Sequence, residues 1–147
     1  MPDPAYDLAR RVVALLRRNG FEAYFAGGCV RDRLRDVPPK DYDVATNARP
    51  EAVQRLFPRH VAVGKAFGVI VVVDGETRVE VTTYRAEGTY SDGRHPDGVT
   101  FSDLETDVRR RDFTINGMMW DPETDRLVDL VGGRADLEAR TIRTIGD

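Results

Sequence analysis

The stretch FAGGCVRDRLRDVPPKDYDVAT, residues 25–46, carries the strongest indications of fold and chemistry in the chain. Near its end, Asp41 and Asp43 are separated by one residue. In an extended strand, side chains at i and i+2 point to the same face, so we expect the two carboxylates to enter one space. Like charges that close repel each other unless a cation lies between them. A small cluster of oxygen ligands suits Mg²⁺, which binds one or two carboxylates together with substrate phosphates.

A pair of glycines supplies the second half of this candidate site. Gly27-Gly28 follows the apolar run FEAYFA, residues 21–26, and precedes VRDRL, residues 30–34, whose pattern is helical. A strand–Gly-Gly–helix junction exposes backbone N–H groups at a helix N-terminus, where phosphate binds well. The P-loop pattern is absent, because Gly64-Lys65-Ala66 does not complete it, and so is the dinucleotide-binding glycine pattern. Each motif alone is typical of a solvated strand edge or an ordinary turn, but their order and spacing favour nucleotide chemistry.

The composition indicates one soluble globular domain without a membrane segment. The chain has 147 residues, 41% hydrophobic and 32% charged, and no apolar run approaches the ~20 residues of a membrane helix. The N-terminus lacks the layout of a signal peptide, and the single cysteine, Cys29, excludes an internal disulfide. These features predict a cytoplasmic location. The net charge of −3 indicates that any contact with nucleic acid is local, at the arginines within residues 31–35 and 109–111.

The order of apolar and helical patterns predicts an α+β domain, with a mixed sheet of about five strands and helices mainly on one side. The β-branched run within residues 67–73 and the alternation of residues 78–84 predict two strands joined by a turn at Asp74-Gly75. Further strands are expected at 21–26, 41–45 and 100–101 and in a hairpin of 118–121 with 126–130, and helices at 4–18, 29–35, 50–57 and 104–110. A last short helix and strand follow Gly132-Gly133, and residues 86–98 are expected to form a mobile loop.

Three motifs carry a family resemblance: AGGCVRDRLRDVPPKDYDVAT at residues 26–46, RVEVTTYRAEGTYSDGRHPDGVTF at 78–101 and RRRDFTINGMMWDP at 109–122. The first resembles the signature of the DNA polymerase β-like nucleotidyltransferases. The other two narrow the resemblance to the head domain of class II CCA-adding enzymes and bacterial poly(A) polymerases. The resemblance implies that residues 1–147 form the nucleotidyltransferase catalytic head, and that the neck, body and tail domains of such enzymes are absent. We therefore expect an excised head rather than a naturally minimal enzyme.

The resemblance also implies roles for individual residues. Asp41 and Asp43 would bind two Mg²⁺ ions, and Gly27 and Gly28 would hold the incoming triphosphate through backbone N–H groups. Arg31, one helical turn further on, would reach the phosphates. The segment RRDFTIN would contact the nucleotide, its ribose in particular, through Arg110, Arg111, Asp112 and Asn116, and Asp92, Gly93 and Arg94 would belong to a flexible loop that reshapes the base pocket.

Glu80 is our candidate for a third catalytic carboxylate. In the strand expected at residues 78–84, Val79 and Val81 face one way, while Arg78, Glu80 and Thr82 face the other. A neighbouring strand is where the superfamily that this chain resembles places such a group. The competing interpretation is a surface ion pair of Glu80 with Arg78 or Arg85. Arg109 is left out of the site, since a cation at a helix end stabilises the helix dipole.

The reaction implied by the resemblance is nucleotidyl transfer to RNA. The 3′-hydroxyl of an RNA, most simply a tRNA 3′ end, attacks the α-phosphorus of ATP or CTP, and pyrophosphate leaves. CCA, CC-only, A-only and poly(A) addition all remain open at this point. A small-molecule nucleotidyltransferase is a second hypothesis, against which the RRDFTIN segment argues. A non-catalytic nucleotide- or RNA-binding module is a third, against which the paired Asp41 and Asp43 argue. No membrane partner is expected, and the sequence carries no signal for an oligomeric state.

Overall fold

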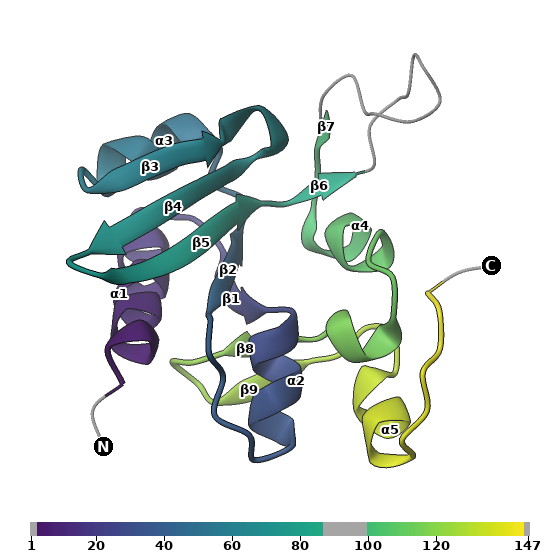
Figure 1. Cartoon of the computed structure of the whole chain (residues 1–147). Helices are drawn as coiled ribbons and strands as arrows, with labels where there is room; N and C mark the ends of the chain where they lie inside the picture. Colours follow the sequence, from purple (N-terminus) through teal and green to yellow (C-terminus); the bar gives the residue numbers. More distant parts are fainter. Residues whose placement is uncertain (1–2, 87–99, 146–147) are drawn as a thin grey trace.

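The computed structural model describes residues 3–86 and 100–145 and confirms a mixed α+β architecture (Figure 1). Its main sheet has seven strands in the order β3-β4-β5-β2-β1-β8-β9. The strands are β1 Ala23–Ala26, β2 Asp43–Thr46, β3 His60–Gly64, β4 Val69–Asp74, β5 Thr77–Thr83, β8 Met119–Asp121 and β9 Arg126–Val128. The central pair β2–β5 is parallel, and every other neighbouring pair in this sheet is antiparallel. Strands β6 Arg85–Ala86 and β7 Thr100–Phe101 form a separate two-stranded sheet.

Helices cover mainly one face of this sheet, as expected. The helices are α1 Pro4–Arg18, α2 Gly28–Leu34, α3 Pro50–Leu56, α4 Leu104–Arg109 and α5 Gly133–Glu138, with short 3₁₀ turns η1 Lys65–Phe67 and η2 Thr114–Asn116. The larger core joins α1, α2 and α3 to this face and includes Val12, Val30 and Val53. A smaller core on the opposite face brings α4, through Val108, against the sheet.

The first helix shows how the local sequence sets an element. The side chain of Asp3 accepts a hydrogen bond from the Tyr6 N–H, and Pro4 occupies the first turn, where its missing N–H costs nothing. Leu8, Val12 and Leu16 recur at helical spacing and are all buried against the sheet. The helix ends at the predicted position, with Asn19 as its C-cap.

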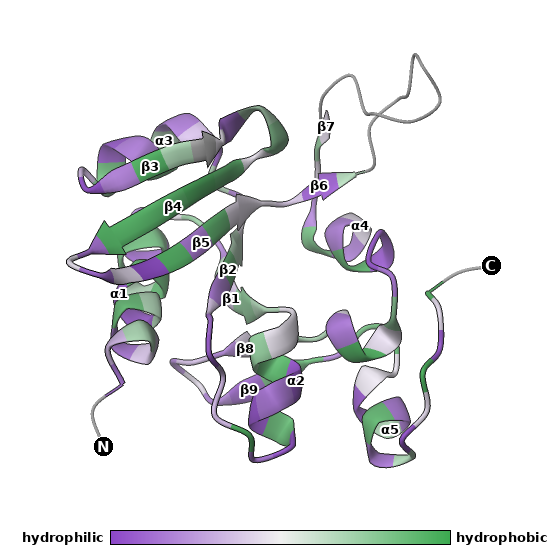
Figure 2. Ribbon diagram, in the orientation of Figure 1, coloured by the Kyte–Doolittle hydropathy of each residue, from purple (hydrophilic) through white to green (hydrophobic). Residues whose placement is uncertain are grey.

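Alternation along the central strands determines which residues reach the open face. Val79 and Val81 are buried in the larger core, whereas Glu80 between them is exposed. In β2, Val44 points into the same core, which leaves Asp43 on the opposite face. Figure 2 shows β4 as hydrophobic along most of its length. This agrees with its position between β3 and β5 in the sheet and with its contact with α3. The candidate chemistry therefore lies on the face that α1 and α3 do not cover.

Four sequence predictions need correction. The main sheet has seven strands rather than about five, because the hairpin β8–β9 joins it and because β3 was not predicted. β3 is an edge strand with an irregular register and an exposed Val61, so it lacks the periodic burial of an inner strand. β2 begins at Asp43, so Asp41 lies in the segment that leads into the strand. In place of the predicted strand after α5, the described residues up to 145 form only an isolated bridge of Thr144 with Phe113.

Residues 87–98 of the predicted mobile loop lie outside the described residues, and with them Asp92, Gly93 and Arg94. Within residues 3–86 and 100–145, no helix combines the length and apolar character that crossing a membrane requires.

The close packing of α5 on η2 predicts that adding a single methyl group at Gly133 lowers the stability of the domain. A Cβ on Gly133 would overlap the Thr114 carbonyl oxygen and lie 2.9 Å from Met118 Cγ. We expect Gly133→Ala to lower the free energy of unfolding by about 3 kcal/mol, since neither backbone can move freely. Urea unfolding followed by circular dichroism measures this change.

The adjacent Gly132→Ala is the matched control for this packing prediction. Gly132 has a positive φ of 80°, but a Cβ added there would meet nothing within 4 Å, so this variant should lose only about 1 kcal/mol through backbone strain. An equal or smaller loss for Gly133→Ala would contradict the packing of α5 on η2.

Candidate active site

Three carboxylates line one cavity where β2 begins beside β5. Asp43, the first residue of β2, lies opposite Glu80 in the parallel register of the two strands. Asp41, Asp43 and Glu80 line one cavity of about 380 Å³, together with Tyr42, Val71 and Arg78. The pairing of β2 with β5 thus brings Glu80 close to Asp41 and Asp43, which are neighbours in the sequence. Arg85, one of the predicted alternative partners of Glu80, instead donates a hydrogen bond of 2.8 Å to the Phe67 carbonyl.

The charge balance of this cavity favours a cation. Burial raises the pKa of Asp43 to about 6, the negative charges of Glu80 and Asp41 add to this, and Arg111 partly offsets it. Within the described residues, no group of three or more His, Cys, Asp and Glu side chains is close enough to form a metal site by itself. The pair Asp41 and Asp43 suits Mg²⁺, which takes one or two carboxylates and completes its shell with water and substrate oxygens. Asp41 and Asp43 are the residues that would hold it.

The predicted glycine pair lies directly beside these acids. Gly27 adopts a positive φ of 76° and caps α2, a conformation that residues with a side chain rarely adopt. A Cβ on Gly27 would lie 3.8 Å from Asp43 Oδ2 and 3.6 Å from Arg111 Nη1. The carboxylate of Asp43 and the guanidinium of Arg111 thus both border the space beside Gly27 that a side chain there would fill.

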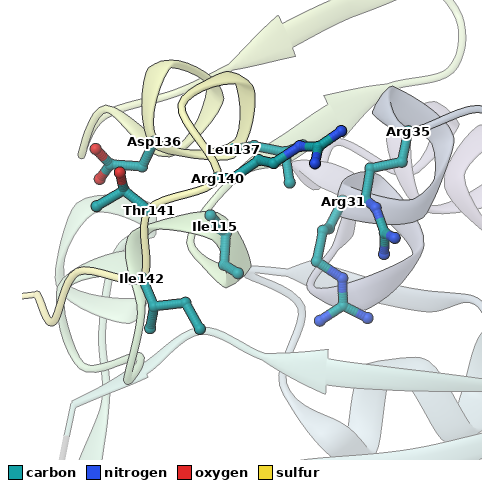
Figure 3. Close-up of a pocket in the computed structure, with 8 residues that line it drawn as sticks. All are labelled: Arg31, Arg35, Ile115, Asp136, Leu137, Arg140, Thr141 and Ile142. Carbon is teal, nitrogen blue, oxygen red and sulfur yellow. The ribbon is translucent and has the colours of Figure 1, made fainter.

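Arg31 and Asn116 form a second part of the site. Arg31 projects from α2 and donates hydrogen bonds to Asn116 Oδ1 at 3.1 Å and to Asp32 Oδ1 at 3.2 Å. It lines a larger cavity of about 770 Å³, in which Arg31 and Arg35 face Arg140, Ile115 and Leu137 (Figure 3). Because Arg31 Nη2 lies 3.4 Å from a Cβ position on Gly28, the glycine pair joins this part to the carboxylates.

The arginines of the RRDFTIN segment line a third cavity, of about 630 Å³, which also includes Asp112. Arg110 and Arg111 both donate to the carboxylate of Asp107, at 3.4 Å and 3.0 Å. Burial lowers the pKa of Arg110, against the raising effect of Asp107. The predicted residues therefore do not share one pocket. Arg111 connects the third cavity to Gly27 and Asp43, while Arg31 and Asn116 lie on the other side of the glycines.

Two residues at the site were missed by the sequence analysis. Tyr42 lies between the two aspartates, and its buried ring packs edge-on against Phe25 and Tyr6, which fixes the segment that carries Asp41. Asp107 precedes Arg110 and Arg111 by three and four residues, which is the spacing of partners on one helix face, so this signal was present in the sequence. Cys29 is buried, and its burial raises the pKa of its thiol to about 11, which agrees with a packing role at the strand–helix junction.

The family of this chain follows from comparison with known proteins. The family described as Poly A polymerase head domain matches residues 23–143. The chain belongs to this family. A CCA-adding enzyme of Geobacillus thermodenitrificans is 45% identical to it over 98% of the chain and 36% of that enzyme. One of Streptococcus pneumoniae is 44% identical over 96% of the chain and 35% of that enzyme.

Solved members of the family share the fold. The Bacillus stearothermophilus CCA-adding enzyme in complex with CTP superposes with a TM-score of 0.86 at 39% identity, over 99% of this chain and 34% of that one. The Thermotoga maritima CCA-adding enzyme complexed with tRNA_CCA gives a TM-score of 0.71 at 26% identity, over 99% of this chain and 34% of that one. The chain thus spans about a third of the length of these relatives.

The raised pKa of Asp43 predicts a stability change with a defined dependence on pH. A carboxyl whose pKa is higher in the folded than in the unfolded state favours folding when protonated, and stability falls as pH rises from about 4 through about 6. In metal-free protein at pH 7, Asp43→Asn should raise the free energy of unfolding by about 1–2 kcal/mol, once solvent screening is included. The gain should vanish near pH 4, and thermal unfolding in chelator measures both values.

Added Mg²⁺ should reverse this difference, because only the carboxylate gains from the cation. Asp74→Asn serves as the control. Asp74 lies on the same sheet, but Arg11 lowers its pKa, so its neutralisation should not stabilise the domain. An Asp43→Asn variant no more stable than the wild type at pH 7 would contradict the crowding of negative charge at β2.

Proposed function

We propose that this chain is the catalytic head, residues 1–147, of a template-independent RNA nucleotidyltransferase that adds CMP, AMP or both to tRNA 3′ ends and releases pyrophosphate. The observation that carries the proposal is the in-register pairing of Asp43 with Glu80, with Asp41 in the same cavity and Gly27 alongside. Membership of the Poly A polymerase head domain family and similarity to CCA-adding enzymes support it. The free, buried Cys29 suits the reducing cytoplasm, where tRNA is processed.

Each part of the site has a defined task in this reaction. Two Mg²⁺ ions held by Asp41 and Asp43 would clamp the attacking and leaving oxygens and neutralise the triphosphate. The N–H groups of Gly27 and Gly28 would bind phosphate oxygens, and Arg31 and Arg111 would add positive charge on either side of them. Positioning and charge stabilisation account for most of such a reaction, so no covalent nucleophile is needed. Asp43 and a water molecule are the two candidates for accepting the proton of the RNA hydroxyl.

The remaining predicted residues complete the nucleotide site. Arg110, Asp112 and Asn116 lie on the α4–η2 segment that carries Arg111, and we assign them to the ribose and base side of the nucleotide. Glu80 is assigned as the third carboxylate, because it faces Asp43 across the two parallel strands. ATP and CTP are the proposed substrates, and solved relatives in complex with each nucleotide support this choice.

Removal of either paired acid should abolish transfer. We expect Asp41→Ala and Asp43→Ala to reduce incorporation of labelled CMP or AMP by on the order of 10²–10³-fold or more, the loss that follows removal of one preorganised charge-stabilising group. Circular dichroism should show an intact fold, since the acids repel each other without metal. Asp74→Ala, an exposed carboxylate on the same sheet, should retain full activity. Activity within about tenfold of the wild type in either active-site variant would reject the assignment.

The products of one incubation distinguish the possible additions. The chain, Mg²⁺, labelled ATP or CTP and tRNA lacking its 3′ end should yield short, defined extensions if tRNA is the substrate. A long A-only ladder on any RNA would instead indicate poly(A) polymerase activity, the second candidate, which the family description favours. Because the chain spans about a third of its relatives, we expect nucleotide binding with weak affinity for RNA and poor base selection. Accurate, efficient CCA synthesis by these residues alone would refute that expectation, and nucleotide binding without any transfer would indicate a binding module.

A further inference from the structure

Asp107 on α4 is a buried carboxylate at the centre of a hydrogen-bond network. Its side chain is only 1% exposed. Its Oδ1 accepts from Arg111, at 3.3 Å from Nε and 3.0 Å from Nη2. Its Oδ2 accepts from the Arg85 backbone N–H at 3.0 Å and from Arg110 Nη2 at 3.4 Å. A carboxylate buried in this way needs hydrogen bonds and positive charge to offset its lost hydration. Here they come from Arg85, Arg110 and Arg111.

The bonds to Asp107 determine which nitrogen of Arg111 remains for other partners. Nε and Nη2 both face the carboxylate, so Nη1 points away from it. Nη1 lies 3.6 Å from a Cβ position on Gly27, and the same position lies 3.8 Å from Asp43 Oδ2. A planar guanidinium fixed along one edge cannot rotate, so its remaining amino group is held beside the glycine pair.

The network also leaves an excess of positive charge. Two guanidinium groups, those of Arg110 and Arg111, share the single charge of Asp107. Within the described residues, the buried Nε of Arg110 has no hydrogen-bond partner. Asp107 therefore balances only one of these two guanidinium charges, and an anionic ligand would balance the other.

We infer that Asp107 is a positioning residue for nucleotidyl transfer: it holds Arg111 so that Nη1 faces a phosphate group bound at the Gly27-Gly28 backbone. Through its other oxygen it fixes β6 to the same helix, so the arginine pair and the strand share one anchor. This inference rests on the proposed function, because the anion that Arg111 would contact is the triphosphate of the substrate. Asp107 itself touches no substrate in this role and acts only through Arg111.

A purely architectural role for Asp107 would join α4 to β6 and nothing more. The two roles differ in one measurable respect. Loss of an architectural bond lowers stability alone, whereas loss of a positioning residue also weakens nucleotide binding beyond what the lost stability explains. A second carboxylate on α4 provides the comparison: Asp103 accepts a hydrogen bond from the Thr106 N–H at 2.9 Å, caps the helix and is exposed.

The test compares Asp107→Asn with Asp103→Asn in the 147-residue chain. The asparagine keeps the shape of Asp107 but removes the charge and places an N–H₂ group against one of its donors. We expect Asp107→Asn to raise the Kd for Mg²⁺–CTP, measured by calorimetry, by about tenfold to a hundredfold. Asp103→Asn should change this Kd by less than about twofold while lowering Tm. Equal Kd values for the two variants would overturn the role of Asp107.

Combination with Arg111→Ala tests whether Asp107 acts through that arginine. In an Arg111→Ala background, Asp107→Asn should weaken CTP binding no further, because the group that it positions has already gone. Additive losses would overturn the inference. If the wild-type chain bound no CTP, both the proposed function and the role of Asp107 would be rejected. If the wild type bound CTP and Asp107→Asn left that binding unchanged, only the role of Asp107 would be rejected.

A measurement on the wild type keeps the inference testable if Asp107→Asn does not fold. The Nε–H group of Arg111 donates to a carboxylate that is shielded from water, so its ¹⁵N-resolved NMR signal should persist at neutral pH and exchange slowly. Arg109, whose Nε donates to the exposed Glu105, is the internal reference and should exchange rapidly. Equally fast exchange at both arginines would overturn the fixed orientation of Arg111.

Discussion

Repulsion between carboxylates, imposed by the pairing of two parallel strands, is the constraint on which the rest of this site depends. β2 and β5 lie side by side with their valines in the larger core. Because side chains alternate along a strand, this packing places Asp43 and Glu80 next to each other on the opposite face of the sheet. Hydrophobic burial behind the sheet offsets the cost of charge crowding in front of it. The domain thus maintains an acidic pocket whose mutual repulsion a bound cation would relieve.

Two arginines beside this pocket are held by other partners in the described part of the chain, so they do not form ion pairs with Asp41 and Asp43. Arg111 lies close enough to Asp43 to lower its pKa, yet its bonds go to Asp107 rather than to Asp43. Arg31 is likewise held by Asn116 and Asp32. Because each guanidinium already has a partner, neither closes onto the acidic pair, and the space beside Gly27 stays available. Polar partners on neighbouring elements therefore matter as much as the charged residues themselves.

The sequence predicted those parts of the molecule that depend on local patterns. The capped helix α1, the alternation around Glu80 and the order strand–Gly-Gly–helix follow from periodicity and turn residues, and the structure confirms them. β3 escaped prediction because an exposed edge strand has no strict alternation, and its pairing comes entirely from β4. The link of Arg31 to Asn116 could not be derived, since it joins residues that only the packed fold brings together. Asp107 could have been found, because its helical spacing from Arg110 and Arg111 is a local signal.

The parallel pairing of β2 with β5 has a consequence for the order in which the molecule assembles. The chain between these strands carries α3, β3 and β4, so the pairing of Asp43 with Glu80 joins residues that lie far apart in the sequence. Contacts between residues far apart in the chain carry a large entropic cost and form late in folding. In a partly folded chain Glu80 is therefore separated from Asp41 and Asp43, and the acidic cavity is complete only once the sheet has closed.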